Sequence, residues 1–377
     1  MKNKLLNTSL IMLLVASLLI GCSNNQKSVK DIKGENYRLT KLDLYSKLDL
    51  NTEKNEYIFI NSVNNNKAYF TYEQFEKNEG TGRSKTLRIG EYDIKSSEVK
   101  FIEEFNNTMF VNDVTCNNNN EIIYACYDEQ NHWYIKKLNN LEESIIDEGD
   151  NFTFMPKLVK NGSRLFYLYE KINKTEDFFE YQYGVNEILG KGEFSEIDKH
   201  KIRIKDEKEI TEKEGIIDGN FYSSKNAVAY LTHKAKNPFV NVVILNTGKT
   251  KNIEIDGKIH NVNLLKDEVL MSLEDTKTGK IKLEALDYSS GNVAKSDVNF
   301  PLYRMESNGN DKVLAIDESF NIYLVDIYNN SIGLKNIDVE GHVQEPVLFE
   351  KISEKEFLIH YGNQGMKKKE IYLLTIR

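Results

Sequence analysis

The stretch KLEALDYSSG, residues 282–291, decides the fold of this chain. An alternating apolar run ends at Leu286, an aspartate follows at once, and Tyr-Ser-Ser-Gly completes a polar segment. Asn, Asp and Gly tolerate the left-handed backbone of tight turns, and Ser hydrogen-bonds to the local backbone. The stretch therefore predicts a β-strand that ends in a tight hairpin turn.

The same phrase recurs along the chain. Its other copies are RIGEYDIKSS at 88–97, YIKKLNN at 134–140, VVILNTGK at 242–249 and IYLVDIYNN at 322–330. The turn residues are Asp93, Asn139, Asn246, Asp287 and Asp326, at intervals of 46, 107, 41 and 39 residues. The long interval predicts one more copy, and KIRIKDEKEIT, with Asp206, fills it. The C-terminal EIYLLTIR is a last copy without a turn.

Hairpins of a second kind lie between these copies. They are YIFINSVNNNKAYFTYE at 57–73, FMPKLVKNGSRLFYLYE at 154–170 and LYRMESNGNDKVLAIDE at 302–318. Each unit then holds two inner strands, a and b, followed by two outer strands, c and d, around the Asp or Asn turn. A repeat of about 40 to 50 residues with four short strands is typical of a β-propeller. The sequence therefore predicts an all-β fold with four-stranded antiparallel blades.

The hairpin at 154–170 carries a more specific pattern. Pro156 precedes Asn161-Gly162 by four intervening residues. This resembles the Pro-x-x-x-x-(Asp/Asn)-Gly hairpin of TolB-type and YncE-like propellers. The resemblance extends as a pattern over residues 36–377 and implies the same architecture.

The inner hairpins number seven, beginning near residues 57, 109, 153, 216, 259, 301 and 343. The last unit, from Val343, has only three strands, and the alternating segment NYRLTKLDL at 36–44 can supply the fourth. Pairing the two ends closes the ring and removes the open sheet edges. We expect seven blades, with six or eight as alternatives and a pair of antiparallel β-domains as the second choice of fold.

The N-terminus has a separate character. Lys2 and Lys4 precede an uncharged, mostly apolar run that ends in Leu-Ile-Gly-Cys at 19–22. A positive start, a short apolar segment and a small residue before a break are typical of a secretory signal. The residues LIGC resemble the lipobox of bacterial lipoproteins; an ordinary cleaved signal is the alternative.

The lipobox resemblance implies loss of residues 1–21 and a diacylglycerol-type lipid on Cys22. The protein would then lie outside the cytoplasm, anchored to the outer leaflet of the cytoplasmic membrane at the cell surface. Polar residues 22–35 would form a flexible tether, and 36–377 a monomeric ectodomain. The richness in Asn, Lys and Ile suggests a Gram-positive source of low GC content.

Charge and cysteine content exclude some functions. The net charge is −8, and it becomes −10 without Lys2 and Lys4. An acidic protein is a poor partner for nucleic acid. In the hairpin around Asn117 to Asn120, Cys116 and Cys126 are too far apart along the strands to bridge. We therefore expect no disulfide.

Two connections between strands b and c look long, at 74–86 and at 171–198. Long loops in compact domains are usually functional or disordered. The second carries the aromatic residues Phe178, Phe179, Tyr181 and Tyr183. We expect either an exposed contact patch on an insertion or an extra strand pair packed on the outside.

The central channel is the second candidate for a binding site. The expected inner strands place one polar residue from each of five units near it: Asp113, Asp218, Asn261, Arg304 and Glu345. Such a ring could hold a cation, a sugar or a peptide terminus, or simply line a hydrated channel.

Motifs of enzymes and metal sites are absent from the sequence. It has no Gly-rich phosphate loop and no Gly-x-Ser-x-Gly, and its six histidines never fall at metal-ligand spacing. We expect no cofactor and no metal. We expect the function to be binding or scaffolding of a protein, peptide or glycan. The alternatives are an enzyme that acts on extracellular or cell-wall glycans through channel carboxylates, and a structural or assembly lipoprotein.

Overall fold

The computed structural model describes residues 37–48, 50, 56–75, 84–105, 109–139, 142–150, 154–189, 193–206, 208–328, 331–337, 346–361 and 370–376. The expected signal 1–21, Cys22, the tether 22–35 and Glu345 lie outside these residues. No helix in the described ranges is long and apolar enough to cross a membrane.

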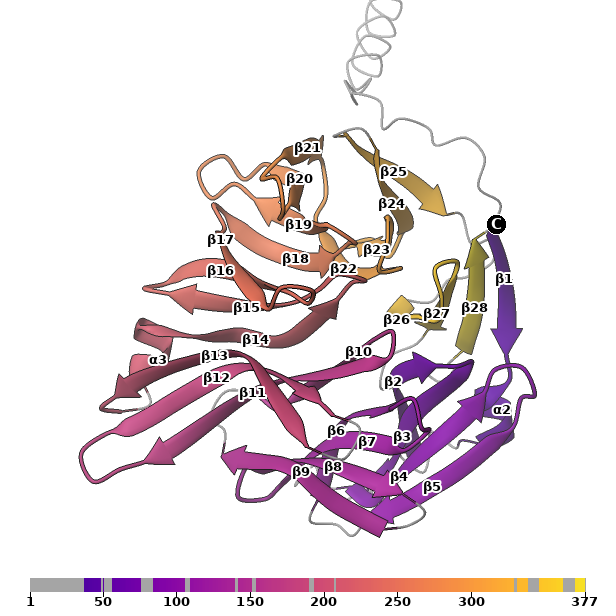
Figure 1. Cartoon of the computed structure of the whole chain (residues 1–377). Coiled ribbons are helices and arrows are strands. Elements are labelled where there is room, and N and C mark those ends of the chain that lie inside the picture. The colour runs from indigo at the N-terminus through magenta and orange to yellow at the C-terminus, as the bar shows by residue number, and fades with distance from the viewer. Residues whose placement is uncertain are drawn as a thin grey trace, which may run out of the picture.

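The described strands form seven four-stranded antiparallel sheets around one ring (Figure 1). Blades 1 to 3 are β2 (Glu56–Asn64), β3 (Lys67–Phe75), β4 (Ser84–Asp93), β5 (Val99–Phe105); β6 (Met109–Cys116), β7 (Ile122–Asp128), β8 (His132–Asn139), β9 (Glu142–Asp150); and β10 (Lys157–Asn161), β11 (Arg164–Lys174), β12 (Phe179–Ile188), β13 (Phe194–Ile204). Blades 4 and 5 are β14 (Glu214–Ser223), β15 (Ala227–Lys234), β16 (Asn237–Ile244), β17 (Lys249–Glu254); and β18 (Lys258–Leu264), β19 (Glu268–Glu274), β20 (Ile281–Asp287), β21 (Val293–Val298). Blades 6 and 7 are β22 (Leu302–Ser307), β23 (Lys312–Asp317), β24 (Ile322–Tyr328), β25 (Ser331–Ile337); and β26 (Pro346–Lys351), β27 (Glu356–Tyr361), β28 (Glu370–Ile376) with β1 (Tyr37–Leu42). The predicted seven-bladed propeller is confirmed.

The ring closes through its two ends, as predicted. β1 pairs antiparallel with β28, from Tyr37 opposite Ile376 to Leu42 opposite Ile371. In Figure 1 the indigo first strand lies beside the yellow last strand. The short helix α2 (Leu44–Leu48) follows β1, and Leu44 is fully buried between blades 7 and 1.

The core is divided into seven apolar clusters, one between each pair of neighbouring blades. Among the described residues, twelve buried apolar side chains form the cluster between blades 5 and 6, and eight form the cluster between blades 2 and 3. Each blade is buried on both faces, so its middle strands read as nearly continuous apolar runs. The clusters hold the inner strands at fixed positions around the central channel.

The predicted c–d turns are built by local hydrogen bonds. The Asp93 carboxylate accepts the backbone N–H groups of Lys95 and Ser96, and Asp287 does the same with Ser289 and Ser290. These side chains replace backbone partners that the turn would otherwise leave unsatisfied. The repeated phrase therefore specifies the turn itself.

Blade 3 corrects the prediction of an insertion at 171–198. Its strands β11, β12 and β13 run continuously through this segment, and the b–c connection is only the short turn from Thr175 to Phe178. Asp206 follows the outer strand β13 and does not occupy a c–d turn; the short helix α3 (Lys208–Glu212) comes next. The interval of 107 residues is long because it spans two blades: the c–d connection of blade 3 lies between Ile188 at the end of β12 and Phe194 at the start of β13.

The two cysteines in the described residues are buried and unbridged, as predicted. Cys116 pairs with Ile122 across the hairpin. Cys126 pairs with Val111, farther along the same hairpin. Both thiols belong to the apolar cluster between blades 1 and 2.

Candidate binding sites in the channel and between blades 2 and 3

The inner strands of all seven blades enclose a central chamber of about 520 Å³. Its lining comes mainly from the second halves of these strands, next to the a–b turns. The chamber therefore lies toward the a–b side of the channel. The polar and charged lining residues are Asn61, Ser62, Asn64, Asp113, Thr115, Lys157, Lys160, Asn220, Ser223, Asn263, Glu306, Ser307, Glu350 and Lys351.

Three carboxyl groups in the chamber lie deep enough to lose hydration. Burial raises the pKa of Glu306 to about 7, although attraction to Lys351 and a hydrogen bond from its backbone N–H oppose the shift. Burial raises the pKa of Glu350 well above its ordinary value, and the negative charges of Glu306 and Asp113 add to the effect. Near neutral pH the carboxyl groups of the chamber therefore carry, in total, less than one negative charge each.

Asp113 is the best-satisfied carboxylate of the chamber. It accepts the backbone N–H of Leu158 at 3.0 Å, from the neighbouring blade, and that of Val114 at 3.0 Å. Burial raises its pKa, and these hydrogen bonds and Lys157 act in the opposite direction. Asp113 therefore joins β6 to β10 as well as contributing charge.

Lysines supply the opposite charge. Burial lowers the pKa of Lys351, and the carboxylates Glu306 and Glu354 partly restore it. Burial also lowers the pKa of Lys160. The chamber thus presents both acidic and basic groups.

The channel residues predicted from sequence are only partly in this chamber. Asp113 lines it. Asn261 and Arg304 lie two positions before the lining residues Asn263 and Glu306 on the same strands, nearer the other entrance. Asn261 donates from its side-chain amide to the Tyr303 carbonyl, and Arg304 is exposed.

The side chains of the two other predicted channel residues lie outside what the structure describes. Asp218 lies in β14, but its side chain is outside what the structure describes, as is the whole of Glu345.

Sequence reasoning missed the chamber residues Glu306, Glu350, Lys157, Lys160 and Lys351. In six of the seven described a–b hairpins, the pairing register shifts within the inner strand. Beyond such a shift, counting every second residue no longer identifies the side chains that face the channel. A usable signal was a charged residue just before the a–b turn of an apolar strand, as in Met305-Glu306-Ser307 and Phe349-Glu350-Lys351.

The predicted exposed patch of aromatic residues in blade 3 is wrong in its main members. Tyr181 is fully buried and Tyr183 is 1% exposed, and both belong to the core between blades 3 and 4. Phe179 packs against that cluster, and Phe178 lies under the Arg203 guanidinium, whose carbon is 4.6 Å from the ring centre. The alternation of these residues marks a strand with one face in the core.

A second hollow, of about 660 Å³, lies between the outer parts of blades 2 and 3. We call it the 2–3 groove. Its lining consists of His132, Tyr134, Glu148, Gly149, Asp150, Tyr169, Lys171, Ile172, Asn173, Gln182, Asn186, Phe194, Glu196 and Lys199. Sequence reasoning did not find it, because its walls come from separate strands whose facing is set only by the ring.

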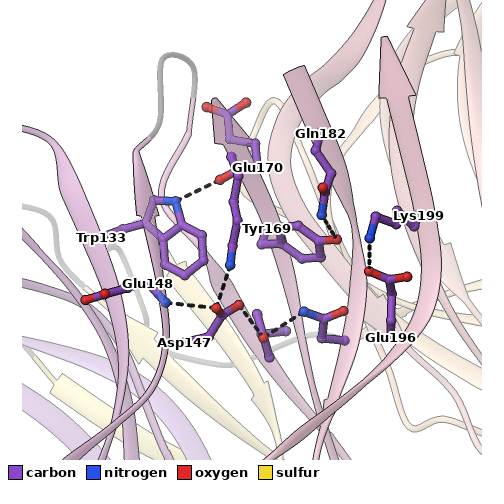
Figure 2. A network of polar contacts seen from close by, with 11 residues as sticks. Trp133, Asp147, Glu148, Tyr169, Glu170, Gln182, Glu196 and Lys199 are labelled. Carbon is purple, nitrogen blue, oxygen red and sulfur yellow. Dashed lines mark hydrogen bonds and ion pairs between the residues drawn. The ribbon is translucent and has the colours of Figure 1, made fainter. Parts of the chain in front are cut away.

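Asp147 organises the floor of the 2–3 groove (Figure 2). Its carboxylate is 2.5 Å from the Lys171 ammonium and accepts the Tyr167 hydroxyl at 2.6 Å and the Glu148 N–H at 2.9 Å. The Lys171 ammonium also lies 5.2 Å from the centre of the Trp133 ring, whose indole N–H donates to the Glu170 carbonyl at 2.7 Å. The buried Asp147 carboxylate is thus compensated by a cation and two hydrogen-bond donors, and the Trp133 ring lies near that cation.

No group of three or more His, Cys, Asp or Glu side chains suited to a metal ion occurs in the described ranges.

Comparisons with known proteins show the fold. No family model matches the sequence, and no curated protein matches it. Among solved structures, the chain resembles an acylaminoacyl peptidase (13% identity, TM-score 0.57), covering 90% of this chain and 54% of the peptidase. It also resembles an oligogalacturonate lyase from Vibrio parahaemolyticus (10% identity, TM-score 0.53), covering 92% of this chain and 98% of the lyase. A third similar structure is YCF48 bound to D1 peptide (11% identity, TM-score 0.51), covering 93% of this chain and 100% of YCF48.

The chain spans about half the length of the acylaminoacyl peptidase, and also of a prolyl endopeptidase that it resembles. At these identities the likeness concerns the propeller fold alone.

Proposed function

We propose that this protein is an extracytoplasmic lipoprotein whose propeller binds a protein, peptide or glycan partner through the central chamber. The Leu-Ile-Gly-Cys sequence at 19–22 supports a lipid anchor on Cys22, on the outer leaflet of the cytoplasmic membrane. Two acyl chains on one residue suffice for stable anchoring. Binding would then take place close to the membrane.

The observation that carries the binding role is the meeting of charges in the chamber. Carboxyls from β6, β22 and β26 and lysines from β10 and β26 line one cavity. A chamber with both signs of charge suits a ligand that carries both, such as a peptide segment. YCF48, which has the same fold, was solved with a bound peptide, and this supports a peptide as the first class to test.

The test compares capture by the full chain from detergent-solubilised native membranes. The variant Glu306→Gln/Glu350→Gln removes both ionisable carboxyl groups and keeps the side-chain shapes. Glu268→Gln is the matched control, because burial raises its pKa too but it lies in β19, away from the chamber. We expect the wild type and the control to capture the same partner, and the double variant to capture about tenfold less. Equal capture by all three would overturn a chamber site.

The anchor has its own test. Cys22→Ser should release the protein into the medium and abolish labelling by a radioactive fatty acid. Retention of label in this variant would contradict lipidation at Cys22.

The raised pKa of Glu306, about 7, also favours a second candidate: an enzyme that acts on cell-wall or extracellular glycans. A carboxyl that is still protonated near pH 7 can serve as a general acid. Wild-type protein would then release reducing ends from cell-wall glycan, with one limb of the pH profile near 7, and Glu306→Gln would not. Absence of product from the wild type would exclude this candidate.

A further inference from the structure

The outer parts of blades 3 and 4 meet around one histidine. His200 lies in β13, and its side chain is 26% exposed. Its ring stacks flat on the ring of Tyr183 in β12, with ring centres 4.8 Å apart and planes inclined by 6°. The stacking fixes the plane of the imidazole, so the directions in which its two nitrogens point are set by the sheet.

Each nitrogen of this ring faces a carboxylate. Nε2 lies 3.4 Å from Oδ2 of Asp198 in the same strand, and Nδ1 lies 3.6 Å from Oε1 of Glu214 in β14 of blade 4. Nε2 is buried and Asp198 is not aligned for a full hydrogen bond with it, so charge attraction provides this contact. A neutral imidazole has one N–H donor and one lone pair, and would turn the lone pair toward one of the two carboxylates. The arrangement therefore suits the imidazolium ion, which presents a proton to both.

Hydroxyl groups hold both carboxylates across the same interface. Tyr230 of β15 donates to Oδ2 of Asp198 at 2.5 Å, and Thr250 of β17 donates to Oδ1 at 3.1 Å. Tyr183 of blade 3 donates to Glu214 of blade 4. Burial raises the pKa of both tyrosines far above the ordinary value, so their hydroxyls remain donors. The positions of the carboxylates are thus fixed whether or not the histidine is charged.

The charges around His200 favour its protonation. The nearby Asp198 carboxylate raises the pKa of His200, burial opposes the shift, and Glu214 adds to it, while the cation Lys234 of β15 acts in the opposite direction. Burial alone would raise the pKa of Asp198, but its contacts with His200 and Tyr230 lower it below the usual value. The two partners therefore stabilise each other's charged forms.

The strand that carries this histidine is free to open locally. β13 is the last strand of its sheet and pairs only with β12. The pairing register shifts beside Asp198, because Val185 lies opposite Asp198 and Asn186 opposite Glu196. Few backbone hydrogen bonds therefore resist a local opening of this strand.

We propose that His200, Asp198 and Glu214 form a proton-dependent clamp that holds β13 of blade 3 against blade 4. While the ring is charged, one positive charge lies between two negative charges and the strand is held. When the proton leaves, two carboxylates face a neutral ring and the contact weakens. The three residues are not part of the chamber lining, so the clamp is independent of the proposed binding role.

Proton linkage sets the direction of the response. Because the pKa of His200 is raised in the folded protein, its stabilisation is complete below the usual value of 6.5 and is lost as pH rises through the higher value. Because the pKa of Asp198 is lowered, its contribution is present above 3.8 and is lost only as pH falls through a still lower value. The clamp is therefore closed in mildly acidic solution and opens in alkaline solution.

The first test follows the histidine itself. The full chain in detergent is labelled with ¹³C-histidine, and its six ring signals are titrated by NMR; the signal missing from His200→Gln belongs to His200. We expect its midpoint above 6.5. Glu214→Gln keeps an acceptor for the Tyr183 hydroxyl and should lower that midpoint. A midpoint at or below 6.5, or no response to Glu214→Gln, would overturn the proposal.

The second test follows the strand. Amide hydrogen exchange of the full chain is measured by mass spectrometry at about pH 5.5 and about pH 8.5, on either side of the usual histidine pKa, and corrected for the intrinsic pH dependence. In the wild type, we expect peptides from the second half of β13 to exchange about fivefold faster at the higher pH. In His200→Gln they should exchange equally fast at both. Equal protection of the wild type at both pH values would contradict the clamp.

His132 provides the matched control. Its nitrogens also face two carboxylates, Asp150 at 2.6 Å and Asp128 at 3.9 Å, but its side chain is 51% exposed. His132→Gln should therefore leave the exchange of β13 as it is in the wild type. Loss of the pH response in this variant would place the titrating group at His132 instead.

Discussion

Two interfaces of the same ring are built in different ways. Between blades 5 and 6, twelve buried apolar residues pack into a continuous cluster. Between blades 2 and 3 the cluster is smaller, and Asp147, Lys171 and Tyr167 occupy part of the contact. The fold needs only that neighbouring blades exclude water near the channel, so the outer part of one interface can be polar and hollow. The comparison predicts different responses to substitution.

The largest effect is expected in the apolar interface. Leu283 is fully buried between blades 5 and 6. Leu283→Ala should lower the free energy of unfolding by about 2 to 5 kcal/mol through lost burial and the remaining cavity. Urea denaturation monitored by fluorescence measures it. A loss below about 1 kcal/mol would show that this interface is not the tighter of the two.

In the polar interface, the expected effect is smaller and depends on the pairing. Lys171→Met leaves the buried Asp147 carboxylate with only the Tyr167 hydroxyl and the Glu148 N–H, and should cost about 2 kcal/mol. Adding Asp147→Asn should recover part of that loss. A double-mutant cycle measures the coupling.

The exposed pair Lys258–Glu274, at 3.1 Å, is the control for this cycle. Its coupling should be at most about 0.5 kcal/mol, because the lysine side chain is 63% exposed. Equal coupling in the two pairs would remove the distinction between the interfaces.

Glu306 in the chamber is a buried carboxyl whose charge is less well stabilised by its neighbours than that of Asp147. The pKa of Glu306 is raised from 4.5 to about 7, so between these pH values the unfolded chain releases a proton that the folded protein keeps. Stability should therefore fall as pH rises from about 4.5 to 7 and change little from this group above 7, by about 3 kcal/mol in all.

Glu306→Gln should flatten that part of the pH profile, measured as the urea midpoint at several pH values. An unchanged slope in Glu306→Gln would show that another group titrates there.

The smallest effect on stability is expected at Gly149, in the groove. A Cβ there would lie 2.9 Å from Cγ of Lys171 and 3.0 Å from Cζ2 of Trp133. The lysine chain can shift, so Gly149→Ala should cost about 1 kcal/mol or less. Thermal unfolding of the variant beside the wild type measures this loss.

Much of the architecture could be predicted because its determinants are local. Asp93 and Asp287 satisfy their own turns, so the phrase that contains them marks each outer hairpin wherever it occurs. The closing strand could be found by its alternation and by the missing fourth strand of the last unit. Blade 3 was misread because KIRIKD ends in an aspartate that resembles a turn, although it follows the outer strand.

The sites could be predicted only in part, since they depend on register and on facing blades. Asp113 was placed correctly in the channel, whereas Glu306 was missed in favour of Arg304 two positions earlier, in a strand with a register shift between Leu302 and Arg304. The 2–3 groove combines residues from five strands of two blades, and no spacing along the chain connects them.

The pairing of β1 with β28 has a mechanical consequence. Tyr37, at the start of β1, lies opposite Ile376, so a pull on the chain ahead of Tyr37 acts first on the last residues of β28. β1 is the outermost strand of blade 7, and peeling it away would leave β26, β27 and β28 paired. Under tension the pairing between β1 and β28 can therefore open one residue pair at a time, while the inner strands of the ring stay in place.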